Sequence, residues 1–73
     1  MVANPDIAAR FGRRLASLRK ERGLTQDEFA ARSGLNRTYI SDVERGHRNI
    51  SLRNIEVVAK TLKVTLSELM DGL

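Results

Sequence analysis

Residues 35–49, LNRTYISDVERGHRN, gather side chains that can bind a charged or hydrogen-bonding surface. Arg37, Arg45 and Arg48 each carry a planar guanidinium, whose donors match phosphates and the edge of guanine. Hydroxyl, amide and carboxylate groups fill most positions between them. The chain has no cysteine, a single histidine (His47) and no glycine-rich phosphate loop. The pattern therefore indicates non-covalent recognition, and it predicts no enzyme activity, no cofactor and no metal.

The same residues form a two-sided pattern on a helix that advances about 100° per residue. Ile40, Val43 and Glu44 share one face, which we expect to point toward the rest of the protein. The opposite face carries Thr38, Ser41, Asp42 and Arg45, and Arg37 reaches outward from the first turn. A helix of this kind fits the major groove of DNA, which is about 12 Å wide. The alternative is an ordinary solvated surface.

Helical spacing and capping signals on both sides of this segment predict an all-α fold of five short helices. The first helix is expected to have Asn4 as N-cap, Pro5 at its first position and Asp6 in its first turn. It should end at Gly23. Its inner stripe is expected to comprise Ile7, Phe11, Leu15 and Leu18.

The four later helices have start signals of their own. These are a capping box or an N-cap at Thr25–Glu28, Asn36, Ser51 and Thr65–Glu68. Gly34 and Gly46 should end the second and third helices. The inner faces of the fourth and fifth helices are expected to carry Leu52, Ile55, Val58, Ala59, Leu62, Leu66, Leu69 and Met70.

Length and charge limit the remaining possibilities. With 73 residues the chain forms one domain, residues 1–73. Eleven of its thirteen Lys and Arg residues lie within residues 10–53, and the net charge is +4. A basic surplus favours a polyanionic partner, although a solubilising surface explains it equally well. No membrane-spanning run or signal peptide is visible, so we expect a cytoplasmic protein without a membrane partner.

The run LRKERGLTQDEFAARSGLNRTYISDVERG resembles the phage repressor and Cro (XRE-like) family of helix-turn-helix proteins. A closer resemblance, carried by SGLNRTYISDVERGHRNISLRNI, is to the controller proteins of restriction–modification systems. The resemblance covers about residues 7–70. It implies a lambda-repressor-like DNA-binding domain, with the helix-turn-helix at about residues 25–45, formed by the second and third helices, and a bacterial or phage origin.

The resemblance also implies roles for individual residues. It assigns DNA contacts to Gln26, Arg37, Thr38, Tyr39, Ser41, Asp42, Arg45, Arg48 and Asn49. Gln26 is expected to contact a phosphate, and Arg37 is expected to be the main reader of bases. The hydroxyl of Tyr39 would reach a phosphate, or its ring would pack on the second helix. Asn49 would hold the DNA backbone or only cap the turn.

Asp42 departs from the family pattern, because controller proteins tend to have a small residue at this position. Its carboxylate would be repelled by phosphates. It could accept a hydrogen bond from cytosine N4, pair with Arg45, or hydrogen-bond Thr38.

Two structural expectations follow from the same resemblance. Arg19 should form a partly buried ion pair with Glu44, which would hold the first helix against the third. A single reading helix contacts too few base pairs to select a site, so a homodimer on a palindromic operator is expected. The dimerisation region is placed at about residues 52–71, with Ile50, Val64, Leu66 and Leu69 at the interface. The alternative puts these four residues in the core of the monomer.

The sequence thus favours a DNA-binding transcriptional regulator, specifically a controller that times expression of a restriction endonuclease. RNA polymerase is a further candidate partner. Within the same class the alternatives are a phage-type repressor or the DNA-binding component of an antitoxin. The alternative from another class is a protein-interaction module that has lost DNA binding.

Overall fold

Local capping defines where the helices begin. In the computed structural model, which describes residues 6–73, the side chain of Asn36 accepts hydrogen bonds from the backbone N–H groups of Thr38 and Tyr39. Ser51 accepts from the N–H of Asn54 at 3.1 Å. Both predicted capping boxes are present, with Thr25 and Thr65 each exchanging two hydrogen bonds with the glutamate three residues later. These N-caps confirm four of the predicted helix starts.

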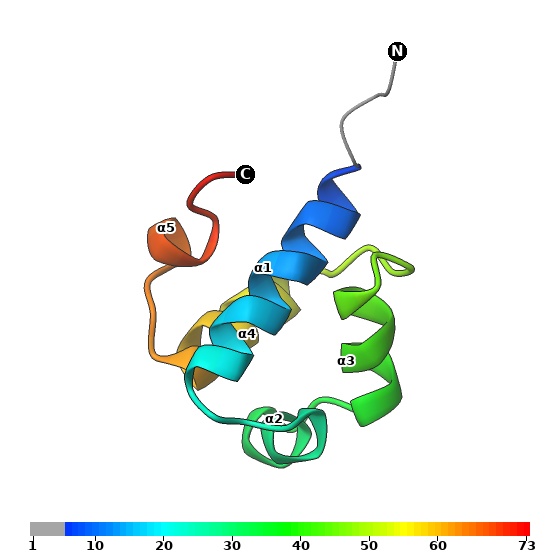
Figure 1. Ribbon diagram of the computed structural model, residues 1–73, viewed down its shortest axis with the longest axis vertical. Coiled ribbons are helices and arrows are strands. Elements are labelled where there is room, and N and C mark those ends of the chain that lie inside the picture. Colours follow the sequence, from blue (N-terminus) through cyan, green and yellow to red (C-terminus); the bar gives the residue numbers. More distant parts are fainter. Residues whose placement is uncertain (1–5) are drawn as a thin grey trace.

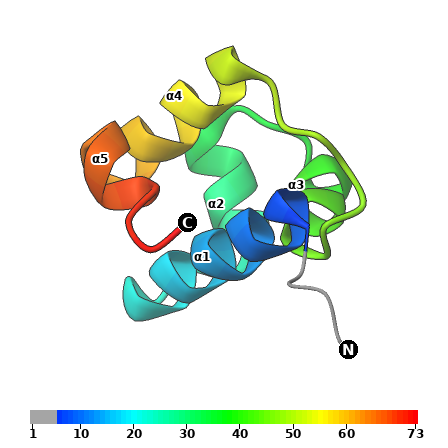
Figure 2. The same cartoon turned by 90° about the horizontal axis from the view of Figure 1, so that it is seen from above.

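Within residues 6–73 the chain folds into five helices and no strand, which confirms the all-α prediction. The helices are α1 (Ile7–Glu21), α2 (Gln26–Ser33), α3 (Arg37–Glu44), α4 (Leu52–Leu62) and α5 (Leu66–Leu69). In the view from above, α1 and α4 lie on opposite sides of the core, with α3 at one end and α5 at the other (Figure 2). The pair α2–α3 forms the helix-turn-helix, joined by a turn with Gly34 in the left-handed conformation (Figure 1).

The start of α1 differs from the prediction. Asp6 is the N-cap, and its carboxylate accepts from the N–H of Ala8 at 2.6 Å, so it does not lie in the first turn. Aspartate caps a helix as well as asparagine does, which is why the sequence did not distinguish the two. The expected cap Asn4 and the following Pro5 lie outside the described residues.

The core lies where all five helices meet. Its fully buried large side chains are Phe29, Leu15, Ile40, Leu62, Leu69, Val43 and Val58. Three residues assigned to inner faces are exposed instead, Ile7 at 53%, Leu52 at 79% and Leu66 at 47%. Each is the first residue of its helix, and the first turn of α4 lies at the periphery of the molecule (Figure 2). Periodicity identifies the side of a helix, but it does not show how far along the helix its neighbours extend.

Gly12 allows α1 to cross α3 at close range. A Cβ atom added at Gly12 would lie 2.5 Å from the backbone oxygen of Glu44 and closer still to that of Val43. At Gly46, just after α3, an added Cβ would lie 2.8 Å from the Cα of Ala9. These two glycines therefore set the distance between α1 and the C-terminal end of α3.

Candidate nucleic-acid interface

The inward side of α3 fixes the helix to the domain. Ile40 and Val43 are each only 1% exposed and belong to the core. Beside them, Glu44 receives two hydrogen bonds from Arg19, Nε to Oε2 at 2.6 Å and Nη2 to Oε1 at 3.0 Å. The side chains of this pair are 9% and 7% exposed. The sequence expected this pair, and the structure brings the two residues together.

The ion pair is part of a larger network. Arg19 Nη1 also donates to the backbone oxygen of Leu24 at 2.7 Å, at the end of the α1–α2 connection. The hydrogen bond from Arg19 to Glu44 raises the pKa of the guanidinium above its ordinary value. Since each buried charge has a charged, hydrogen-bonded partner, burial of the pair is tolerated, whereas a lone charge here would be costly.

Gln26 joins this network from the first position of α2. Its Nε2 donates to Glu44 Oε1 at 3.0 Å, so a side chain expected at DNA phosphate also supports α3. The three residues link α1, α2 and α3, which fixes the orientation of α3 relative to the N-terminal end of α2.

The outward side of α3 is open to solvent. Arg37, Thr38 and Arg45 are exposed, and Ser41 is half-buried. The guanidinium of Arg37 lies 3.3 Å from the carboxylate of Asp27 on α2, and both side chains are largely exposed. An exposed pair of this kind contributes little stability, so it leaves Arg37 available to a ligand.

Asp42 has a defined partner. Its Oδ1 accepts from Arg45 Nη2 at 2.9 Å, an i,i+3 pair along the helix. The sequence suggested two partners for Asp42 within the protein, Arg45 and Thr38. The structure shows the hydrogen bond with Arg45. The carboxylate is 29% exposed and the guanidinium 61%, so the pair lies on the outer face of α3.

Tyr39 connects α3 to α4. Its hydroxyl accepts from Asn54 Nδ2 at 3.1 Å, and its ring packs against the core. The guanidinium of Arg48 lies over the ring, 5.0 Å from its centre. One interpretation of the sequence had the ring of Tyr39 packing on α2. The hydrogen bond between its hydroxyl and Asn54 was not predicted. A polar residue in the first turn of α4 gave no signal, because its partner is fifteen residues away.

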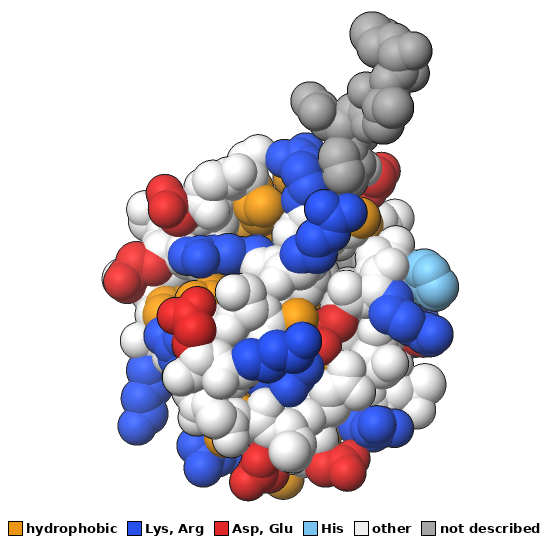
Figure 3. Space-filling view, in the orientation of Figure 1, with side chains coloured by type: hydrophobic (Ala, Val, Ile, Leu, Met, Phe, Trp, Pro, Cys, Tyr) orange, Lys and Arg blue, Asp and Glu red, His pale blue; other side chains and the backbone are white. Residues whose placement is uncertain are grey.

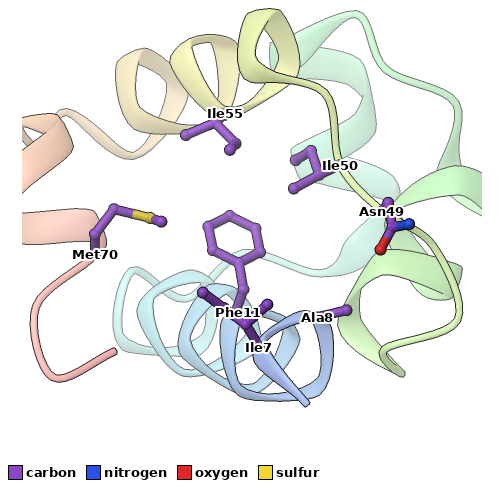
Figure 4. A pocket seen from close by; sticks show the side chains of 7 residues that line it. All are labelled: Ile7, Ala8, Phe11, Asn49, Ile50, Ile55 and Met70. Atoms are coloured by element: carbon purple, nitrogen blue, oxygen red, sulfur yellow. The ribbon is translucent and has the colours of Figure 1, made fainter.

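Asn49 and His47 are exposed in the connection between α3 and α4. Asn49 lies at the edge of an apolar hollow of about 160 Å³, together with Ile50 (Figure 4). The ring of Phe11 points into this hollow from α1, and Met70 closes one side (Figure 4).

Three further arginines, in α1 or at its C-cap, form hydrogen bonds with backbone carbonyls of the protein itself. Arg10 Nη1 donates to the backbone oxygen of Leu73 at 2.6 Å, and Arg14 donates to those of Glu68 and Leu69. Arg22 Nε donates to the oxygen of Leu62, the last residue of α4. Basic and acidic side chains are interspersed over the face in Figure 3. The basic surplus seen in the sequence is therefore partly structural.

The residues expected at a dimer interface fall into different environments. Leu69 is completely buried, so its side chain has no free surface for a partner, and the expectation for it is wrong. Ile50 and Val64 are half-buried against the core. Leu66 is 47% exposed and lines a shallow hollow with Leu52, Arg53 and Glu56. The exposed apolar surface in this region is thus formed by Leu52 and Leu66.

Two further observations concern residues 6–73. Over this range, no three side chains that could ligate a metal lie together. None of the helices in this part of the chain combines the length and the apolar character needed to cross a bilayer.

Comparison with known proteins agrees with this geometry. Residues 15–69 match the family model described as "Helix-turn-helix". The chain is 49% identical over 69 residues to the control protein C.MunI of a Mycoplasma species, covering 93% of each chain. It is 42% identical to the control protein C.BamHI of Bacillus amyloliquefaciens, covering 90% of this chain and 83% of that one.

Solved structures show the same likeness. The restriction–modification controller protein C.AhdI from Aeromonas hydrophila superposes with a TM-score of 0.85 at 45% identity, covering 88% of this chain and 97% of that chain. The controller protein C.Esp1396I, crystallised as a tetramer with its natural 35 base-pair operator, gives a TM-score of 0.84 at 31% identity, with 93% and 90% covered. The chain therefore belongs to the XRE-like helix-turn-helix family, within which it groups with the restriction–modification controller proteins.

Proposed function

We propose that the protein is a transcriptional regulator that binds double-stranded DNA by placing α3 in the major groove. The observation that carries this proposal is the contrast between the two sides of α3. Its inner side is held by Ile40, Val43 and the Arg19–Glu44 pair, while its outer side presents Arg37 and Arg45 to solvent. A rigidly mounted helix with exposed guanidinium forks suits direct reading of bases.

Individual contacts follow from position on this surface. Arg37, with Thr38 beside it, is assigned to base edges, because both are exposed in the first turn of α3. Ser41 is assigned to the same groove. Gln26, at the N-terminus of α2, and Arg48 are assigned to phosphates, since helix N-termini and guanidinium groups both favour anions.

Asn49 is assigned to phosphate beside them, because it is exposed just after α3. The hydroxyl of Tyr39 is held by Asn54, which favours a supporting role for the ring beneath Arg48.

The protein is proposed to act as a homodimer on a palindromic operator. A two-fold interface would cover Leu52 and Leu66, which are 79% and 47% exposed, with Ile50 and Val64 at its margin. Two copies related in this way would read half-sites about one helical turn apart. The tetramer of C.Esp1396I with its operator supports assembly on DNA.

Likeness to the controller proteins supports a role in timing expression from a restriction–modification locus. The bound dimer would act on RNA polymerase at the promoter, either by recruiting it or by excluding it. Such a role places the protein with the DNA, in the cytoplasm of a bacterium. The relatives are regulators, which supports a non-catalytic function.

The test of DNA binding begins with selection of a preferred duplex from a random library by the wild-type protein. Affinity for this duplex and for a scrambled duplex of equal composition is then measured by fluorescence anisotropy at several salt concentrations. Specific regulators prefer their site by at least about 10³-fold, with affinity falling steeply as salt rises. Equal affinity for the two duplexes, or no binding, would contradict the proposal.

The dimer is tested by sedimentation of Leu52→Asp and Leu66→Asp. Each leucine is the first residue of its helix, where aspartate is favourable, so the fold should be retained. Both variants are expected to shift the wild-type dimer toward monomer. Ala31→Asp, which adds the same charge on an exposed position of α2, should leave the dimer unchanged. Wild-type protein that sediments as a monomer at micromolar concentration would contradict the dimer.

A further inference from the structure

The outer face of α3 carries a carboxylate among the groups proposed to meet DNA. Asp42 lies about 200° from the buried Ile40 on the helical projection, near the centre of the exposed side. Arg45 lies at about 140° and Thr38 at about 160° on the same projection. An uncompensated negative charge at this place would oppose binding to any DNA. Here the carboxylate is compensated, because it is paired with the guanidinium of Arg45.

We propose that Asp42 is a positioning residue for Arg45, and that the pair sets the ratio of specific to non-specific DNA affinity. The proposal rests on the proposed DNA-binding function and deepens it. Its basis is the hydrogen bond of 2.9 Å between Arg45 Nη2 and Asp42 Oδ1.

The first consequence concerns phosphates. Binding to DNA of any sequence is driven by cations that displace counterions from the phosphate backbone. A guanidinium paired with a carboxylate has no net charge as a unit, so the Asp42–Arg45 pair adds little to this term. A neutral residue at position 42 would leave Arg45 as a full cation on the same surface. Asp42 therefore weakens non-specific binding.

The second consequence concerns base edges. Arg45 uses one side of its fork for Asp42 and keeps further N–H donors, and its side chain remains 61% exposed. Because the carboxylate restricts the guanidinium before DNA arrives, less rotamer freedom is lost when the fork meets a guanine. A held fork also has fewer orientations in which it can turn to a phosphate. In specific binding, Arg45 can therefore still hydrogen-bond a base. In non-specific binding, its positive charge is offset by Asp42 and attracts phosphates less.

The other ion pair on this surface, Arg37–Asp27, is held less firmly than the pair Asp42–Arg45. Asp27 is 82% exposed, belongs to another helix and lies 3.3 Å from its arginine. Asp42 is more buried, and its partner Arg45 is the C-cap of the same helix, only three residues along the chain. The backbone oxygen of Asp42 also accepts from the N–H of His47 at 2.8 Å. The α3 pair is therefore the better fixed of the two.

The test compares Asp42→Asn with Asp71→Asn. Both remove one negative charge, but Asp71 follows shortly after α5, and α5 lies on the opposite side of the molecule from α3 (Figure 1). Anisotropy with the selected duplex and its scrambled counterpart gives the specificity ratio for each protein. Asp42→Asn is expected to bind the scrambled duplex about tenfold more tightly and to lower the specificity ratio several-fold, with the salt slope for the scrambled duplex steeper by about 1. Asp71→Asn should leave both the ratio and the slope close to wild type.

A double-variant cycle identifies the partner. If Asp42 acts through Arg45, Asp42→Asn should change the specificity ratio far less in an Arg45→Ala background than in the wild type. An unchanged ratio in Asp42→Asn, or the same change in both backgrounds, would overturn the inference. So would a loss confined to one cytosine position, since that would make Asp42 itself the reader. If the wild-type protein shows no preference for its selected duplex, the proposed function has failed, whereas a preference that Asp42→Asn does not alter contradicts only this inference.

Discussion

The arginines of α1 and those of α3 have the same chemistry and opposite surroundings. Arg14 on α1 and Arg22 at its C-cap donate to backbone carbonyls of α5 and α4, and Arg19 on α1 is buried against Glu44. On α3, Arg37 and Arg45 are more than half exposed and pair with carboxylates at the surface. The last carbonyls of a helix lack the i→i+4 donors of its interior, so arginines that bond them complete the helix ends and contribute to the fold. Arginines paired at the surface remain accessible, as the proposed DNA contacts require.

The strongest test of this division is removal of Arg19. Arg19→Ala should lower the free energy of unfolding by about 3–5 kcal/mol, because it leaves the buried Glu44 without its partner. Thermal and urea unfolding followed by circular dichroism measure this change. Arg13→Ala, at an exposed position of the same helix, should stay within about 0.5 kcal/mol of wild type. Equal effects of the two variants would mean that burial on α1 does not separate structural from surface arginines.

Gly12→Ala tests the close crossing of α1 over α3. Helix propensity alone predicts stabilisation by about 1 kcal/mol. We expect destabilisation by about 1–3 kcal/mol or more, since the methyl group would overlap the backbone oxygens of Val43 and Glu44. Urea unfolding gives the sign directly, and Ser17→Ala on the exposed side of α1 is the matched control. A more stable Gly12→Ala would show that the crossing adjusts easily.

Arg37→Ala, on α3, should lower DNA affinity while leaving stability almost unchanged, unlike Arg19→Ala. Its unfolding free energy is expected to change by no more than about 0.5 kcal/mol, because the side chain is 60% exposed. Its DNA affinity should fall by about 1–3 kcal/mol, with relaxed preference at one base position. Selection from a random duplex library measures this preference. Arg14→Ala removes the same charge from α1 and should reduce stability while retaining the base preference, so a relaxed preference there would contradict the division.

The smallest expected effect comes from the capping boxes of α2 and α5. Hydrogen bonds from Thr25 and Thr65 lower the pKa of Glu28 and Glu68 below the ordinary value. A lowered pKa in the folded state means that the stabilisation is complete above the ordinary value of about 4.3 and is lost as pH falls through the folded-state pKa. Stability measured by urea unfolding should therefore decline below about pH 4.

The double variant Glu28→Gln, Glu68→Gln separates this cause from others. Glutamine keeps the capping hydrogen bond but does not titrate, so the variant should lose part of the acid dependence. An acid profile identical to that of the wild type would assign the decline to other carboxylates.

Local signals in the sequence determined where most of the helices begin and which segment is proposed to read DNA. The caps at Thr25, Asn36, Ser51 and Thr65 act over two or three residues, so each is complete within its own stretch of chain. The position of Asp6 as the first cap was the exception. The pattern of α3 likewise separated its buried side from its exposed side, because helical periodicity is a local property.

Only the tertiary structure decided which charged residues bond within the protein and which apolar residues are buried. Arg22 meets a carbonyl forty residues away and Arg10 one sixty-three residues away, distances along the chain that no local pattern encodes. Leu52 and Leu69 both follow helical spacing, yet one is 79% exposed and the other fully buried. The physical reason is that burial and pairing depend on where neighbouring helices end, and this is fixed only when all five pack together.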